Sequence, residues 1–169
     1  MFTGAHLHLL VNHAPIFGSL FALALLIVSY FTSAEVLRRT ALVVLVATAI
    51  AGAAANLSGE PAEDAVKGLP GVRHDDIEAH SGMGDRAYIL GDILGVLALG
   101  ALFRWRRRPI PAGATLVAVL ATAFVSGAFV YTGLIGGRIR HTEVRPGATA
   151  ADALIVEPPR QRRPPPPGN

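Results

Sequence analysis

Six histidines are the residues of this sequence best suited to hold a metal ion or a metal-containing cofactor. The sequence has no cysteine, which excludes thiolate zinc sites, cysteine-held iron–sulfur clusters and covalently attached c-type haem. Imidazole nitrogens bind haem iron, zinc and copper. The histidines are His6, His8, His13, His74, His80 and His141. Their chemistry depends on which elements bring these side chains together.

Four apolar stretches between the histidines are long enough to cross a membrane. A hydrocarbon core of about 30 Å requires roughly 20 apolar residues in a helix. The chain has 169 residues, of which 51% are hydrophobic and only 16% charged, a balance atypical of a soluble domain. We therefore expect an all-α integral membrane four-helix bundle over residues 1–141. Its spans are predicted at residues 14–33, 40–57, 84–103 and 113–132, with a helical loop at 58–83.

Arginines in the two short loops between these spans predict the orientation. They are Arg38, Arg39, Arg104, Arg106, Arg107 and Arg108. Because short loops rich in arginine stay in the cytoplasm, we expect both loops on the cytoplasmic side of a bacterial inner membrane and both termini in the periplasm. The net charge of +3 then reflects topology, and no nucleic-acid partner is expected.

This topology places every histidine at the periplasmic end of the bundle. Three histidines precede the first span, two precede the third and one follows the fourth. Counting helical turns places His13 near the outer boundary of the hydrocarbon and the others at or above it. Four of them could border one cavity: His8, His13, His80 and His141.

Haem b fits such a cavity because imidazoles alone can hold it. We expect one or two haems in a cytochrome b-like electron-transfer subunit, with the four histidines named above as candidate ligands. Arg86, Arg138 and Arg140 are candidate partners for the haem propionates. Glycines on the His80 face of the third span, Gly91 and Gly95 among them, would admit a flat macrocycle or, as we prefer for the glycines alone, close helix packing.

Two alternatives remain open at this point. A zinc or copper ion is the first, because His6 and His8 form a short chelating pair. The candidate metal ligands are His6, His8, His13, His80 and His141. The second is a cofactor-free structural or assembly subunit of a membrane complex. In each case we expect lipid and other membrane subunits as partners, and the acidic loop at 58–83 could dock a periplasmic cytochrome c.

Two further features lie outside this cluster. Asp92 falls near the middle of the third span, where we expect it to be protonated or hydrogen-bonded to a hydroxyl of a neighbouring span, with a structural or a proton-relay role. The tail at 142–169 holds seven of the twelve prolines and is predicted to be extended or disordered.

The chain resembles the bacterial membrane proteins that carry domain of unknown function 2231. The resemblance rests on His8-Leu-Leu-Val-Asn-His13-Ala-Pro15 before the first span, on His80 at the head of the third, and on Gly133-Leu-Ile-Gly136-Gly137 with His141 after the fourth. It covers most of residues 6–145. It implies four helices and haem binding through these histidines, without an established reaction.

Overall fold

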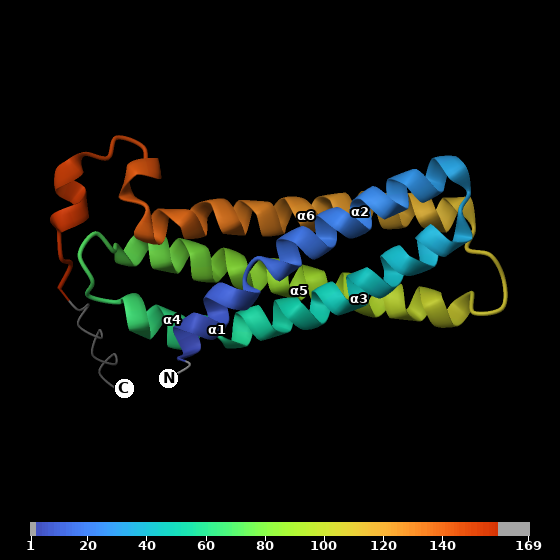
Figure 1. Cartoon of the computed structure of the whole chain (residues 1–169), viewed down its shortest axis with the longest axis horizontal. Coiled ribbons are helices and arrows are strands. Elements are labelled where there is room, and N and C mark those ends of the chain that lie inside the picture. Colours follow the sequence, from blue (N-terminus) through green and yellow to red (C-terminus); the bar gives the residue numbers. More distant parts are fainter. Residues whose placement is uncertain (1–2, 159–169) are drawn as a thin grey trace, which may run out of the picture.

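Long uninterrupted apolar stretches of the sequence fold into four long helices. The computed structural model describes residues 3–158. The long helices are α2 (Ala14–Thr32), α3 (Glu35–Leu57), α5 (His74–Arg104) and α6 (Ala112–Arg140). They lie side by side as a bundle (Figure 1). Each packs on two others, so that α2, α3, α5 and α6 form a closed ring in that order.

All four long helices can cross a membrane. The candidate spans, which include the short helices joined to α2 and α3, are Gly4–Thr32, Glu35–Val66, His74–Arg104 and Ala112–Arg140. Large apolar side chains such as Phe17, Val96 and Val117 are exposed on the outside of the bundle, as suits a surface in contact with lipid. The predicted all-α membrane bundle is confirmed, and the protein is a multi-pass membrane protein.

The helices extend beyond the predicted spans because backbone hydrogen bonding does not stop at the hydrocarbon boundary. The first span matches α2 closely. Helix α5 begins at His74, ten residues before the predicted span at 84, because part of the helical loop expected at 58–83 is continuous with that span. Asp75 and Asp76 lie in the first turn of α5, where carboxylates favour the positive end of the helix dipole. The other long extension is that of α6, which continues to Arg140.

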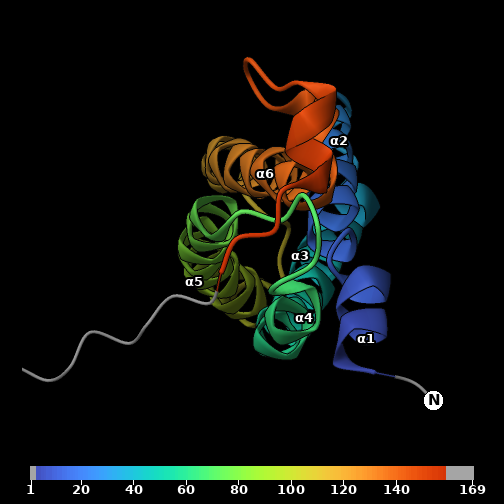
Figure 2. The same ribbon diagram turned by 90° about the vertical axis from the view of Figure 1, so that its left-hand side faces the viewer.

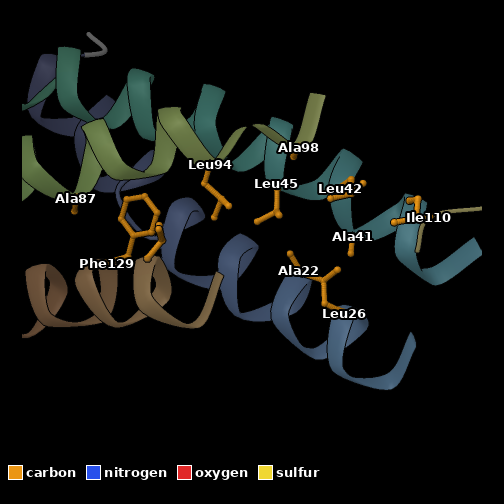
Figure 3. Packing of buried hydrophobic residues seen from close by; sticks show 11 residues of the cluster. Ala22, Leu26, Ala41, Leu42, Leu45, Ala87, Leu94, Ala98, Ile110 and Phe129 are labelled. Carbon is orange, nitrogen blue, oxygen red and sulfur yellow. The ribbon is translucent and has the colours of Figure 1, made fainter. Parts of the chain in front are cut away.

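Small residues let the helices of the ring approach closely. Figure 3 shows the buried cluster that they surround, including Leu45, Leu94 and Phe129. A Cβ atom on Gly91 would lie 2.7 Å from Cζ of Phe129, and one on Gly95 would overlap Cβ of Ala49. Both glycines therefore serve helix packing, the use that we preferred for them.

Substitution of Gly95 by alanine should lower the free energy of unfolding by about 1–3 kcal/mol, because the added methyl group forces α3 and α5 apart. Denaturation of the purified protein in detergent measures this. Gly100→Ala on the same helix is the matched control, since a Cβ there meets no atom within 4 Å. Equal stability of the two variants would contradict the close α3–α5 contact.

Both ends of the described chain lie at one end of the bundle, which we call the terminal end (Figure 1). Two short helices belong to it: α1 (Gly4–Val11), which Thr3 caps, and α4 (Gly59–Val66). Helix α1 packs on α4 and on α3. The opposite end, formed by the loops at 33–34 and 105–111, is called the arginine end.

The C-terminal segment corrects one prediction. Residues 142–157, here called the strap, are folded onto the terminal end instead of being extended or disordered. The strap contains two 3-10 helices, η1 (Thr142–Val144) and η2 (Ala150–Leu154), and covers the end of α6 (Figure 2). The proline-rich run of the predicted tail lies outside the described residues.

Arg145 explains why the strap folds. Its side chain is 5% exposed and pairs with Asp76 at 2.9 Å. Its Nε and Nη2 groups donate to the carbonyl of Arg138 at 2.8 and 2.6 Å, and Nη2 also donates to Gly71 O at 2.7 Å. The carbonyl of Arg138 lies in the last turn of α6, where carbonyls lack partners within the helix. Arg145 of the strap therefore caps the C-terminal end of α6 and also binds the loop before α5 through the carbonyl of Gly71.

Candidate functional site

The histidines lie at the terminal end of the bundle, but only two of their rings contact each other. His6 and His8 belong to α1, His13 precedes α2, His74 and His80 belong to α5, and His141 follows α6. The rings of His8 and His80 are edge to face, with centres 6.4 Å apart and planes at 85°. We call these two residues the histidine pair.

Each ring of the pair is held through Nδ1 by a backbone carbonyl. His8 Nδ1 lies 3.0 Å from the carbonyl oxygen of Ala55 and 3.2 Å from Ser58 Oγ, while His80 Nδ1 lies 3.1 Å from the carbonyl oxygen of Thr132. A carbonyl only accepts, so Nδ1 carries the proton of the neutral ring and donates it. Each ring therefore has a lone pair on Nε2, the form in which histidine binds a metal.

The sequence places glycine where the His80 ring needs space. A Cβ atom on Gly136 of α6 would lie 2.7 Å from both Cε1 and Nδ1 of His80. The predicted glycines lie on the helix of His80 itself, but the glycine that makes room for its ring is on the facing helix. The Gly133-x-x-Gly136-Gly137 stretch was visible in the sequence, whereas its alignment with His80 depends on how α5 and α6 pack.

The distance between the two rings is close to that of two imidazoles that hold one metal ion. A metal–imidazole bond is about 2 Å long and the ring centre lies about 1 Å behind the nitrogen, so two imidazoles on opposite sides of a metal have centres about 6 Å apart. The 6.4 Å between the ring centres is close to this separation, and one ring would have to turn from its edge-to-face position for both Nε2 atoms to point at the same ion. Both rings are half-buried, which suits a haem iron at the edge of a bundle.

The other predicted ligands are placed elsewhere. His13 is exposed and stacks on Phe17, with ring centres 6.5 Å apart. His141 is exposed and its Nδ1 contacts Glu143 at 2.8 Å, while Nδ1 of His6 contacts Thr3 Oγ1 at 2.7 Å. Within residues 3–158, no three His, Asp or Glu side chains are grouped to hold a metal ion. Three or more of the predicted histidines are therefore not grouped around one metal ion in this part of the chain.

The arginines considered for the propionates lie on two helices of the same end. Arg86 is exposed on α5, and Arg138 and Arg140 occupy the last turn of α6. None of the three forms an ion pair in the described part of the chain. Their charges are thus not matched by a carboxylate contact.

Sequence reasoning missed a pocket beside His74. The pocket has a volume of about 370 Å³ and lies between α4, the start of α5 and the strap. Glu157 accepts from the backbone N–H of His74 at 2.9 Å, and its Oε2 lies 2.6 Å from Nδ1 of the same residue. The wall also includes Glu63, Lys67, Ile77 and Glu78. The two partners are 83 residues apart, so no local pattern could have revealed their contact.

The contact between Glu157 and His74 should open in acid. The backbone N–H of His74 and then its side chain lower the pKa of Glu157 below its ordinary value of 4.5, and the nearby charge of Arg73 acts in the same direction. The stabilisation is therefore complete above pH 4.5 and is lost as the pH falls through the lowered pKa. Because the chain has no cysteine, a nitroxide on Val156→Cys reports strap mobility by electron paramagnetic resonance, and this mobility should rise in that pH range.

The control adds Glu157→Gln to the same labelled chain. Its label should already be mobile at neutral pH and should show no step in acid. A label as immobile as in the parent at pH 7 would show that Glu157 does not hold the strap.

Asp92 has a hydrogen-bond partner, though not on a neighbouring span. The hydroxyl of Tyr88, one turn earlier on α5, donates to its carboxylate. The residue is partly exposed on the outside of the bundle. This hydrogen bond runs along one helix, whereas the prediction was for a hydroxyl on a neighbouring span.

Comparisons with protein-family models, with curated proteins and with solved structures give no match to this chain. The functional argument therefore rests on the geometry of the histidine pair and its surroundings.

Proposed function

We propose that this protein is a membrane-embedded, b-type cytochrome-like electron-transfer subunit that holds haem b between His8 and His80. The observation that carries the proposal is the 6.4 Å separation of the two rings, each with Nδ1 at a backbone carbonyl. Two imidazoles with free Nε2 lone pairs are the ligand set of a six-coordinate haem, which transfers single electrons when bound.

The residues around the pair would each have a role in holding the group. The carbonyls of Ala55 and Thr132 fix the tautomer of each ring and raise its basicity as a ligand. Gly136 leaves space beside the His80 ring. Arg86, Arg138 and Arg140 have no carboxylate partner in the described chain and would bind the propionates as charge-assisted hydrogen-bond donors.

The location follows from the charge distribution. We infer a bacterial inner membrane with the arginine end in the cytoplasm and the terminal end, including the histidine pair, in the periplasm. The protein would pass electrons within a larger membrane complex, and a basic periplasmic cytochrome c could dock on the acidic segment at 58–83, whose carboxylates lie on α4 and the start of α5.

A visible spectrum of the purified full-length protein tests this function. The oxidised protein should show a Soret band, and reduction with dithionite should sharpen the α and β bands of a low-spin haem. Extraction of the pigment should give about one haem b per chain. A featureless spectrum from folded protein, produced in cells supplied with haem precursor, would refute the proposal.

Complete packing of the bundle favours a second candidate, a cofactor-free assembly subunit. The faces of Gly91 and Gly95 are filled by Phe129 and Ala49, so the core is closed without a prosthetic group. A zinc or copper site is less favoured, since the pair lacks a third ligand within residues 3–158. Metal analysis of a colourless preparation would separate these two alternatives.

A further inference from the structure

The arginines at the arginine end divide into two groups with different surroundings. Arg38 is 7% exposed, and its Nη1 and Nη2 donate to the carbonyls of Ile110 at 2.8 Å and Ser29 at 3.3 Å. Arg39 donates through Nη2 to the carbonyls of Trp105 and Arg108 at 2.8 and 2.9 Å. These two side chains from the start of α3 thus fix the backbone of the 105–111 loop.

The one carboxylate in these loops is also used to fix them. Glu35 accepts from the backbone N–H of Ile110 at 3.1 Å and pairs with Nε of Arg39 at 2.8 Å. No other Asp or Glu occurs in residues 33–40 or 104–112. The loop is therefore held in place while its own positive charges stay without an acidic partner.

The second group consists of exposed arginine side chains at the end of α5 and in the 105–111 loop. Its members are Arg104, Arg106, Arg107 and Arg108. None forms an ion pair within residues 3–158. The guanidinium of Arg104 lies over the ring of Trp105, 5.9 Å from its centre, and that ring is half-buried. A tryptophan beside arginines at the end of an apolar helix is typical of a side chain at the depth of lipid headgroups.

We propose that the second group, Arg104 and Arg106–Arg108, binds the headgroup phosphates of anionic phospholipids. Guanidinium groups bind phosphate through paired, charge-assisted hydrogen bonds. Because the group lies where α5 ends, directly beside the lipid-facing side chains of the bundle such as Phe103, headgroups are its immediate neighbours. Clusters of arginine at this position attract anionic lipid. The site is independent of any haem at the opposite end.

Lipid retention tests the proposal. Full-length protein in detergent is titrated with phosphatidylglycerol or phosphatidylcholine, and bound lipid is counted by native mass spectrometry. The wild type should retain phosphatidylglycerol preferentially, and the triple variant Arg106→Gln, Arg107→Gln, Arg108→Gln should bind it about tenfold more weakly. Added NaCl should weaken the wild-type interaction, because exposed charges are screened.

A control removes three exposed arginines at the terminal end: Arg73→Gln, Arg86→Gln and Arg140→Gln. This variant should keep the wild-type preference for phosphatidylglycerol. Fluorescence of the single tryptophan, Trp105, checks that the loop remains folded in every variant. Equal loss of lipid from both triple variants, or no loss from the loop variant, would overturn the proposal. Displacement of the lipid by inorganic phosphate at equal concentration would show a simple anion site and would also overturn it.

Discussion

Replacement of His80 by alanine should abolish the sharp reduced α band of the purified protein, and replacement of His8 should do the same. Each substitution removes one of the two imidazoles that would hold the proposed haem, so haem content should fall at least about tenfold. Neither ring can be replaced by a neighbour, because His13 and His141 contact other side chains. The measurement is haem content per chain together with the oxidised and reduced spectra.

The matched controls are His13→Ala and His141→Ala. Both residues are exposed and separate from the pair, so these variants should keep the wild-type spectrum. An α band that survives in both His8→Ala and His80→Ala would reject the assignment of the ligands. If the band is lost in His13→Ala but kept in the other three variants, His13 at the start of α2 would be the ligand in place of the histidine pair.

Replacement of Arg145 by alanine should detach the strap and destabilise the protein by about 3–5 kcal/mol, the usual cost of removing one partner of a buried ion pair. The change leaves the carboxylate of Asp76 and the carbonyls of Arg138 and Gly71 without the guanidinium that they share. Hydrogen exchange should locate the effect, because the amide of Gly71 donates to the carbonyl of Ile155 in the strap at 2.8 Å. That amide should lose its protection in the variant.

Arg140→Ala is the control for this experiment. Arg140 is exposed and forms no ion pair in the described residues, so its loss should change the free energy of unfolding by less than about 0.5 kcal/mol. Wild-type protection of the Gly71 amide in Arg145→Ala would mean that the strap is held by its other contacts.

The bundle could be predicted from the sequence because hydropathy reports directly on membrane spans. Apolar runs of about 20 residues have few stable alternatives to a transmembrane helix. Hydropathy marks only the apolar part of each helix, and the first ten residues of α5 are helical although they lie before the predicted span. The strap could not be predicted, because Arg145 in a proline-rich segment has no local mark of burial and its partner carbonyl on Gly71 is 74 residues away.

The candidate site was predictable only at the level of the topology. Charge patterning placed the histidines at one end, where the structure has them. Which two rings meet depends on the turn between α1 and α2 and on the depth at which α5 faces α6. Both depend on how segments far apart in the sequence pack against each other, and no local pattern of residues predicts that packing.

The closed ring of helices has a consequence for biogenesis. Helices leave the ribosome in chain order, yet the ring is completed by contact between the first long helix, α2, and the last, α6. Until α6 is inserted, α2 and α5 each lack the contact that they make with α6 in the finished bundle. Lipid or an insertion factor must therefore cover the residues of α2 that the finished bundle buries, such as Ala22 and Leu26, during synthesis. The strap is made after all four long helices and joins the terminal end only in a chain that has been translated past α6.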